Sequence, residues 1–310
     1  MQSQTFYSNG KLLLTGEYLV IDGAKVLAIP TDKGQSLTMT EKEGDSQLTW
    51  KSWTFDNKCW LEVTFSLPEF EIIKSSEIKK AQWLQRLLSS AQELNPSFLS
   101  ENKAIEVNTH LEFPRDWGLG SSSTLINNVA QWATIDPFDL HFKISNGSGY
   151  DIACAKENNP IIYSKNNQAQ EIKIASLDKP FFDQVFFVHL NKKQNSNDAV
   201  ISYNELKNEI DLQHCVKIVN QITNQFIEAN SIKDWEKVMD EHEFLISNIL
   251  ERETVKEKLF PLYPHSIKSL GAWGGDFIMV TGTSDDMNYF KSKGYNTILP
   301  YNKMVLKLKH

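Results

Sequence analysis

The sequence contains few cysteines and no long apolar run, and each shortage excludes a class of protein. The 310 residues include three cysteines, Cys59, Cys154 and Cys215, which are too few and too scattered for a disulfide framework or a CxxC metal site. No apolar run approaches the ~18–20 residues of a membrane span. The N-terminus lacks the basic start and apolar core of a signal peptide. We therefore expect a cytoplasmic protein with no membrane partner.

Positive charge is also scarce. The chain has 32 Lys plus Arg against 39 Asp plus Glu, a formal net charge of -7, and only three of the basic residues are arginines. Such a chain is a poor candidate for nonspecific nucleic-acid binding, which depends on neutralising phosphates. If the protein binds a phosphate, backbone N–H groups and lysines must supply most of the contacts.

The order of the expected strands and helices predicts the α+β fold class. Aromatic, β-branched and alternating apolar residues indicate a mainly antiparallel sheet of five strands, at residues 11–14, 26–29, 35–40, 50–55 and 59–65. A further strand is expected at 105–109. Pro30 is expected to end the second of these strands. Apolar residues at three- and four-residue spacing indicate helices at 79–94, 124–134, 199–210, 212–229 and 232–250. Further expected elements are a short helix capped by Asp136, a helix at 284–293, and strands at 185–190, 277–280 and 304–308.

A polar stretch at residues 164–168 is the best candidate for a domain boundary. The length suits one large or two ordinary domains. Strands followed by helices occur twice along the chain, which predicts two lobes. We therefore expect an N-terminal domain of residues 1–165 and a C-terminal domain of residues 166–310.

Seven of the 14 glycines lie in three short clusters, and the first cluster gives the strongest functional signal. Gly118 and Gly120 precede Ser121, Ser122 and Ser123 between an expected strand and an expected helix. Small residues leave backbone N–H groups open to a ligand, and a helix N-terminus adds partial positive charge, so the segment suits a phosphate. A tight turn with a serine cap is the alternative. The segment matches neither a Walker A loop nor a nucleophile elbow.

The second glycine cluster, Gly147 and Gly149, precedes a carboxylate. Asp151 stands after this turn and before small apolar residues, where a cleft can hold it partly desolvated. An aspartate in such a place can orient or deprotonate a hydroxyl. The alternative is that Asp151 only caps the following segment.

A lysine and the third glycine cluster complete the candidate set. Lys11 opens an apolar strand, either as an edge residue that reaches solvent or as a buried cation paired with a carboxylate or phosphate. Gly271, Gly274 and Gly275 run into the strand expected at 277–280. They form either a simple turn or a close approach to a ligand or another backbone.

The histidines give no metal or catalytic motif. His242-Glu243 begins like a zinc-protease helix, but position 246 is isoleucine. His189 lies in an apolar strand and is interpreted as a satisfied core residue. We expect the charged helix face from Glu236 to Glu243 to be solvated.

Together, these segments resemble the GHMP small-molecule kinase superfamily. That family carries a Lys-bearing first strand ending in Gly-Glu, a Pro-x-x-x-Gly-Leu-Gly-Ser-Ser loop, a Ser-Gly-x-x-Asp segment and a glycine-rich C-terminal motif. This chain has all four in that order between Gly10 and Asp276. Residues 147–153, Gly-Ser-Gly-Tyr-Asp-Ile-Ala, resemble the GYDIA-type bacterial subgroup. Gly16-Glu17-Tyr18 is more similar to phosphomevalonate kinases than to the Gly-Glu-His of mevalonate kinases.

The resemblance implies a fold and a set of site residues. The fold is the two-lobed GHMP kinase fold, with a ribosomal-protein-S5-like N-terminal lobe and a ferredoxin-like C-terminal lobe, and ATP and Mg2+ are the implied cofactors. Asp151 matches the catalytic carboxylate and Lys11 the lysine that pairs with it, while Ser122 matches the serine that ligates Mg2+. The implied ATP-binding residues are Gly118, Leu119, Gly120, Ser121, Ser122 and Ser123. The implied substrate-binding residues are Glu17, Tyr18, Ser148, Gly149, Gly271, Gly274 and Gly275.

The sequence departs from the family pattern at several places. Asn9 replaces the proline of the first motif, and Ser123-Thr124 replace the small pair that follows the two serines. Ala272-Trp273 interrupt the glycine run, which leaves the backbone path there open. Asp136 and Asp139 lie near the position of the second Mg2+ ligand without matching it.

The resemblance implies ATP-dependent transfer of the γ-phosphoryl group to a mevalonate-type acceptor, mevalonate or phosphomevalonate, in isoprenoid precursor synthesis. Diphosphomevalonate decarboxylase is an alternative with the same fold. A non-catalytic nucleotide- or metabolite-binding protein is an alternative outside the enzymes, and galactokinase is disfavoured because the first motif lacks the arginine of the sugar kinases. Arg115 is expected either to reach an anionic ligand or to form a surface ion pair with Asp116. The oligomeric state is left between monomer and homodimer.

Overall fold

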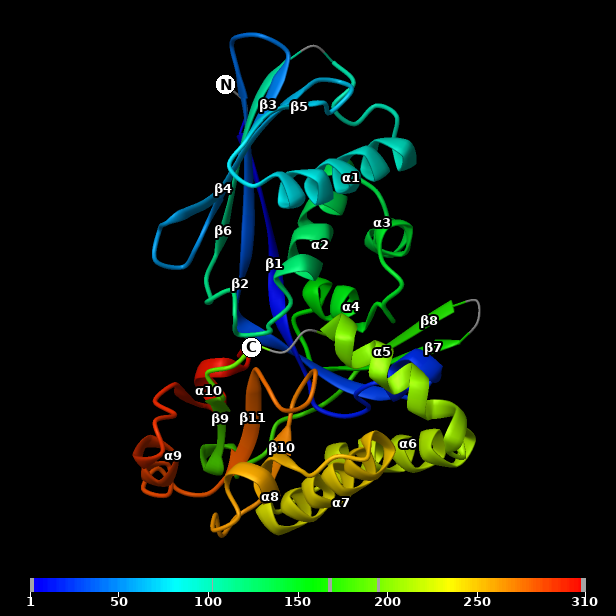
Figure 1. Cartoon of the computed structure of the whole chain (residues 1–310), viewed down its shortest axis with the longest axis vertical. Coiled ribbons are helices and arrows are strands. Elements are labelled where there is room, and N and C mark those ends of the chain that lie inside the picture. Colours follow the sequence, from blue (N-terminus) through cyan, green and yellow to red (C-terminus); the bar gives the residue numbers. More distant parts are fainter. Residues whose placement is uncertain (1–2, 102, 167–168, 194–195, 308–310) are drawn as a thin grey trace. The chain divides into compact units, whose positions relative to one another are not determined.

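The chain divides into two compact units. A computed structural model describes residues 3–101, 103–166, 169–193 and 196–307 (Figure 1). Unit 1 comprises Met1–Gly10, Lys33–Arg115 and Gly120–Lys156, and unit 2 comprises Lys11–Asp32, Asp116–Leu119 and Glu157–His310. Both units combine strands with helices, which confirms the predicted α+β class.

A twisted sheet forms one layer of unit 1. Its strands are β3 (Gln47–Trp53), β4 (Cys59–Ser66), β5 (Ile72–Ser75) and β6 (Ala104–Leu111), with parts of β1 (Ser3–Leu13) and β2 (Val26–Lys42), whose residues 11–13 and 26–32 belong to unit 2. The order is β5-β4-β3-β6-β2, and β1 pairs with β2. The β3–β6 pair is parallel, whereas the β2–β6, β3–β4 and β4–β5 pairs are antiparallel. The mainly antiparallel sheet predicted from the sequence is therefore confirmed.

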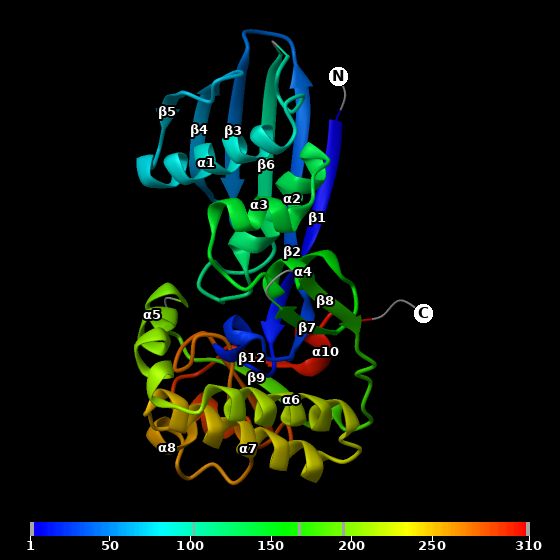
Figure 2. The same ribbon diagram turned by 90° about the vertical axis from the view of Figure 1, so that its right-hand side faces the viewer.

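Helices cover one face of this sheet (Figures 1 and 2). They are α1 (Ile78–Leu94), α2 (Ser121–Ala133) and α3 (Pro137–Ile144), and a shorter helix, α4 (Tyr150–Lys156), follows them in the same unit. The helical spacing seen in the sequence of α1 buries Ala81, Leu84, Leu87, Leu88 and Ala91. Alternate residues of β6 are buried, as expected for a strand with one covered face. Asp136 caps α3 by accepting a hydrogen bond from the Phe138 N–H at 2.7 Å, as predicted.

Pro30 does not end a strand, so the prediction of two separate strands there is wrong. Strand β2 runs without interruption from Val26 to Lys42. Its residues 26–28 pair with β7 (Ile161–Asn166) and its residues 35–42 pair with β6. Pro30 lies between these two paired stretches, so its missing N–H removes no bond from either ladder.

Unit 2 contains a four-stranded antiparallel sheet with the order β10-β11-β9-β12. Helices α6 and α7 run side by side in this unit (Figures 1 and 2). The strands of unit 2 not yet given are β8 (Ala169–Ile174), β9 (Val185–His189), β10 (Ile267–Ser269), β11 (Phe277–Thr281) and β12 (Ile298–Pro300). The helices and 3-10 turns are η1 (Leu19–Asp22), η2 (Phe182–Gln184), α5 (Ser196–Leu206), η3 (Lys207–Glu209), α6 (Leu212–Glu228), α7 (Ile232–Leu250), α8 (Val255–Leu259), α9 (Asn288–Ser292) and α10 (Tyr301–Met304).

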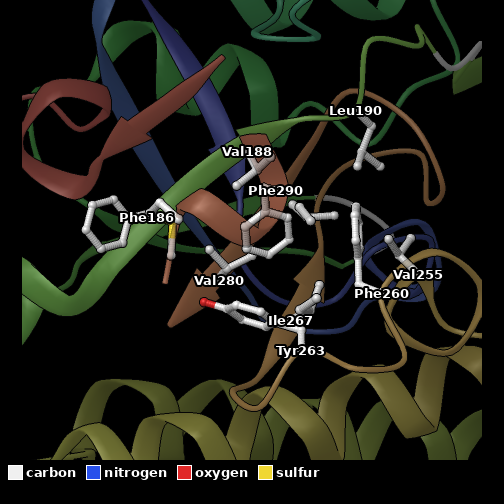
Figure 3. Close-up of a cluster of buried hydrophobic side chains, with 11 residues drawn as sticks. Phe186, Val188, Leu190, Val255, Phe260, Tyr263, Ile267, Val280 and Phe290 are labelled. Carbon is white, nitrogen blue, oxygen red and sulfur yellow. The ribbon is translucent and has the colours of Figure 1, made fainter. Parts of the chain in front are cut away.

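An apolar cluster fixes the sheet of unit 2 to its C-terminal elements (Figure 3). Phe186 and Val188 of β9, Val280 of β11 and Phe290 of α9 belong to it, together with the fully buried Phe260. Burying a side chain of this size contributes about 1.5–3 kcal/mol. Packing in this cluster therefore holds β9 and β11 firmly in place.

Of two C-terminal predictions, one is confirmed only in part and the other is wrong. The helix expected at 284–293 is shortened to α9, because the carboxylate of Asp286 accepts hydrogen bonds from the N–H and hydroxyl of Thr283 and holds a turn there. The strand expected at 304–308 is not found over its described residues, 304–307: helix α10 extends to Met304, and Val305 forms an isolated bridge with Thr31. Residue 308 lies outside the described part of the chain. Tyr301 and Met304, three residues apart, are both buried, which is a helical spacing.

The domain boundary expected between residues 165 and 166 lies within a hairpin of unit 2. Strands β7 and β8 pair there, with Asn166 opposite Ala169. Residues 167–168 lie outside the described part of the chain. The boundary stays a prediction.

In the described ranges, no helix has the length and apolar character needed to cross a membrane.

Candidate active site

Two glycines set the backbone of the glycine loop, residues 114–124. Gly118 has φ +67° and Gly120 has φ +85°, a left-handed conformation that disfavours side chains. Gly120 is the N-cap residue of α2, and no side chain caps that helix. The first intrahelical bond runs from the Thr124 N–H to the Gly120 carbonyl. The preceding N–H groups at the helix start are therefore left for a ligand or solvent.

The hydroxyls that follow Gly120 divide into two pairs. Ser123 donates to the Gly120 carbonyl at 2.8 Å and Thr124 donates to Gln35 Oε1 at 2.6 Å, and both side chains are buried. Ser122 is exposed and Ser121 is half-buried. Within the described residues, neither of these two hydroxyls makes a hydrogen bond. The first pair therefore fixes the turn, and the second pair is available to a ligand.

A buried polar network holds α2 on the sheet of unit 1. Ser8 of β1 donates to Asn128 Oδ1 at 2.7 Å and accepts from Asn127 Nδ2 at 2.8 Å. Asn128 Nδ2 also donates to the carbonyl of Gln35 in β2 at 2.9 Å. Buried polar groups that are all paired fix a single geometry, so the start of α2 has a rigid support.

Lys11 lies against the unit 2 part of the glycine loop, which comprises Asp116–Leu119. Its backbone N–H donates to the Leu119 carbonyl at 3.0 Å and its Nζ donates to the Gly118 carbonyl at 2.9 Å. The side chain is half-buried, so it does not simply extend into solvent. Asp151 belongs to unit 1, and its pairing with Lys11 stays a prediction.

Aromatic packing anchors the same part of the loop. The ring of Trp117 packs edge-on against Phe277 with centroids 5.3 Å apart, and His189 lies at 6.4 Å. His189 Nδ1 accepts from the Asn191 N–H at 3.3 Å, and its Nε2 lies 3.2 Å from the Asp116 carbonyl. With Nδ1 as the acceptor, Nε2 is the ring atom that can donate to the Asp116 carbonyl. His189 is a satisfied buried residue, as predicted, and it also holds the loop.

The third glycine cluster forms a turn that reaches the glycine loop within unit 2. We call residues 271–276 the glycine-rich segment. Gly271, Gly274 and also Trp273 and Asp276 have positive φ, so the backbone there is left-handed even where a side chain is present. A Cβ at Gly118 would lie 2.4 Å from Asp276 Oδ2. Only glycine fits at position 118, and neither Asp276 nor Trp117 was identified from the sequence.

Asp151 stands in the first turn of α4, after Gly149 with φ +90°. The residue is half-buried, and its Oδ1 accepts from the Ile152 N–H at 3.0 Å. Ser148 and Gly149 are buried in the turn before it. The positive φ at Gly149 explains why the sequence needs a glycine there, and one carboxylate oxygen remains without a local backbone donor among the described residues.

Glu17 belongs to a buried charge cluster together with His242, Glu243 and Lys268. All four residues are at most 3% exposed, so the prediction of a solvated face from Glu236 to Glu243 is wrong at Glu243, whereas Lys237, Asp240 and Glu241 are exposed. Lys268 Nζ donates to Glu17 Oε1 at 2.8 Å, and His242 Nε2 lies 3.1 Å from Glu17 Oε2. Burial opposes ionisation of Glu17, but the Lys268 ammonium outweighs it and holds the pKa of Glu17 below its ordinary value. Burial raises the pKa of Glu243 to about 7, with Lys268 opposing the change.

Sequence reasoning missed this cluster because burial of a helix face is a tertiary property. The alternation of apolar and charged residues along α7 reads as amphipathic, but the strand β10 covers part of its charged side. The sequence did contain one signal of this buried cluster: Lys268 stands within the short strand β10, between Ile267 and Ser269. A charged residue inside a strand needs either solvent or a buried partner.

Arg115 lies in unit 1 over an aromatic ring. Its guanidinium carbon is 3.8 Å from the centroid of Trp60, whose ring also has Lys80 at 5.2 Å. This is a cation–π stack, a role considered in neither of the two expectations for Arg115.

The described residues contain no group of three or more His, Cys, Asp or Glu side chains arranged to hold a metal ion. The exposed Ser122 hydroxyl is instead the type of single oxygen ligand that suits Mg2+ bound mainly by phosphates and water.

No protein-family model matches the chain, and no curated protein matches it. Solved structures do match over nearly the full length. The mevalonate kinase of L. major, solved with R-mevalonate, is 14% identical with a TM-score of 0.71, covering 99% of this chain and 97% of that one. The Streptococcus pneumoniae phosphomevalonate kinase, solved with phosphomevalonate and AMPPNP, is 14% identical with a TM-score of 0.67, covering 94% and 96%.

A galactokinase is also similar. The Lactococcus lactis enzyme, solved with galactose, is 14% identical with a TM-score of 0.68, covering 98% of this chain and 93% of that one. The chain therefore has the fold of the GHMP kinases, as its sequence motifs implied. At this identity the likeness establishes the fold and leaves the substrate to be argued from the residues.

Proposed function

We propose that this protein is an ATP-dependent small-molecule kinase that transfers the γ-phosphoryl group to a mevalonate-type acceptor. The observation that carries the proposal is the start of α2. There the positive-φ glycine, Gly120, exposes uncapped N–H groups beside the available hydroxyls of Ser121 and Ser122. The fold is shared with kinases solved with mevalonate, phosphomevalonate and galactose.

The glycine loop binds the ATP phosphates in this proposal. Residues 118–123 supply backbone N–H groups, and the α2 N-terminus supplies partial positive charge, which together suit a polyphosphate. Lys11 adds a full positive charge at the Gly118 carbonyl. With three arginines in the chain, backbone groups and lysines carry this recognition.

In this proposal, Asp151 orients the acceptor hydroxyl or accepts its proton. An aspartate at the start of a helix, with one carboxylate oxygen held by the Ile152 N–H, has its other oxygen free to orient or accept a proton from that hydroxyl. When the acceptor group is already an ionised phosphate, no base is needed and Asp151 acts by orientation. Phosphoryl transfer depends mainly on positioning and charge neutralisation, so this modest role suffices.

The residues present fit a Mg2+ ion that arrives with ATP. Ser122 is the proposed protein ligand, because its hydroxyl is exposed at the helix start and oxygen ligands suit Mg2+. When bound, the ion neutralises phosphate charge. The chain contributes the rigid position of that hydroxyl, which follows from the buried network beneath α2.

A coupled assay of ADP release tests the proposal against mevalonate, phosphomevalonate, diphosphomevalonate and galactose. We expect turnover with mevalonate or phosphomevalonate, and a loss of about 100-fold or more in kcat/KM for Asp151→Asn when the acceptor is an alcohol. Asp45→Asn is the matched control, because Asp45 is an exposed aspartate of the same unit outside every candidate segment. It should retain wild-type rates.

Each alternative has its own outcome in this assay. CO2 release from diphosphomevalonate would identify a decarboxylase. ATP binding without turnover of any acceptor would favour the non-catalytic alternative and overturn the proposal. Full activity of Asp151→Asn with every active acceptor would exclude the catalytic role of Asp151.

A further inference from the structure

The buried charge cluster joins three segments of unit 2 that are far apart in the sequence. Glu17 follows the end of β1, His242 and Glu243 lie in α7, and Lys268 lies in β10. These residues are at most 3% exposed, so they are closed off from solvent. A buried charge is tolerated only when it is paired and hydrogen-bonded.

The contacts of the cluster fix backbone as well as side chains. Lys268 Nζ donates to Glu17 Oε1 at 2.8 Å and to the Ser269 carbonyl at 2.9 Å. The carboxylate of Glu243 accepts from the Ser269 N–H at 2.9 Å and from the Ser269 hydroxyl at 3.0 Å. The Gly16 N–H donates to His242 Nε2 at 2.9 Å. The corner at Gly16-Glu17 is thereby tied to the strand end that leads into the glycine-rich segment.

Strained residues follow both ends of this tie: Tyr18 comes directly after Glu17, and Trp273 comes four residues after Ser269. Tyr18 has φ +66° and Trp273 has φ +38°, conformations that side chains of this size rarely adopt. Tyr18 stacks on Tyr203 with ring centroids 5.4 Å apart. Tyr18, Tyr203 and Trp273 also belong to one buried apolar cluster. Such backbone strain persists only where the contacts around the residue hold it in place.

We propose that Glu17 is a positioning residue rather than an acceptor ligand: through Lys268 and Glu243 it holds Tyr18 and the glycine-rich segment in their strained, substrate-ready conformations. This inference rests on the proposed kinase function for its kinetic consequences. It revises the substrate-binding role that the family resemblance implies for Glu17. Its conformational consequences apply to the ligand-free protein and do not need that function.

An ion pair that only stabilised the fold would behave differently on replacement from one that also positions Tyr18 and the glycine-rich segment. A buried pair replaced by apolar residues of similar volume often leaves stability unchanged or higher, whereas removal of one partner is strongly destabilising. The double variant Glu17→Leu/Lys268→Met therefore separates the two roles. It removes both charges and keeps an apolar filling, but it removes the Lys268–Glu17 bond that ties the Gly16-Glu17 corner to β10, leaving the Gly16–His242 bond in place.

The experiment combines thermal unfolding, hydrogen exchange of the ligand-free protein and steady-state kinetics. We expect each single variant to lower the Tm and the double variant to recover most of that loss. In the double variant, amides of residues 16–18 and 270–276 should exchange about 10-fold faster, with β9 unchanged. The acceptor KM should rise about 10-fold, with the ATP KM changed less than about 2-fold.

Glu17→Gln is the conservative variant, which tests the idea even if the double variant does not fold. It preserves volume and one hydrogen bond to Lys268, so we expect a smaller change in exchange in the same residues. A raised acceptor KM with unchanged exchange in the ligand-free protein would show direct contact between Glu17 and the acceptor, and would overturn the proposal. Wild-type exchange and wild-type KM in the double variant would overturn it as well. Failure of the wild-type enzyme to turn over any acceptor would overturn the kinase function and leave the exchange result to decide this inference.

Discussion

Replacing Gly118 with alanine should destabilise the protein by about 2–5 kcal/mol, because two costs combine at that position. The left-handed φ of +67° costs alanine about 1–2 kcal/mol. The new Cβ would also lie 2.4 Å from Asp276 Oδ2 and 3.0 Å from the Asp276 Cβ. Rotation of the Asp276 side chain cannot relieve the second contact, so overpacking adds about 1–3 kcal/mol.

The backbone of Asp276 cannot move away easily. Its N–H donates to the Lys192 carbonyl at 2.7 Å, and its carbonyl accepts from the Leu190 N–H at 2.8 Å. The glycine loop must therefore shift instead, and we expect the KM for ATP to rise. Urea unfolding gives the stability change, and ADP release at varied ATP gives the KM.

Gly294→Ala is the matched control for this prediction. Gly294 has φ +90°, but a Cβ there would meet nothing within 4 Å. The substitution should lower the free energy of unfolding only by the cost of the left-handed backbone, about 1–2 kcal/mol, and it should leave the ATP KM unchanged. Adding Asp276→Gly to Gly118→Ala should recover the overpacking part, since glycine accepts the φ of +51° at position 276. Equal losses for the two single variants, or no recovery in the double variant, would refute the reasoning.

The remaining predictions concern one hydroxyl and one buried carboxyl. Ser122→Ala should lower kcat/KM for MgATP about 10-fold or more without changing the Tm, because the exposed hydroxyl supports no other group; an unchanged value would remove Ser122 from the site. The pKa of Glu243 is raised by burial from an ordinary 4.5 to about 7, so the folded state favours its protonated form. That stabilisation is present below about pH 4.5 and is lost as pH rises through about 7. Unfolding free energies between pH 5 and 7.5 should therefore fall less steeply in Glu243→Gln than in the wild type, and parallel curves would contradict this.

The sequence predicted best those features that local geometry controls. The helical spacing in residues 79–94 and 232–250 corresponds to α1 and α7 as observed. Gly118, Gly120 and Gly149 have positive φ, which is why these positions carry glycine. A left-handed turn is a property of the local backbone, so glycine placement indicates it without knowledge of the rest of the fold.

Features that depend on distant partners were not predictable in the same way. Pro30 breaks a strand by propensity, yet β2 continues because its two ladders lie on either side of the proline. Glu243 looks solvated in a helix pattern, yet β10 covers it and Ser269 binds it. Lys268 and Asp276 gain their roles only through residues more than a hundred positions away, Glu17 and Gly118. Burial and pairing of charge follow from tertiary structure, which a single sequence does not display.

The central claim is that this protein transfers the γ-phosphoryl group of ATP to a small acceptor, and label transfer measures that step itself. ATP labelled at the γ-phosphate would be incubated with the protein, Mg2+ and mevalonate or phosphomevalonate, and the products separated. The account predicts label in the phosphorylated acceptor in a one-to-one ratio with ADP, and a reduced rate with Gly118→Ala. Label found only in ATP, or released as free phosphate with every acceptor of the panel, would contradict it.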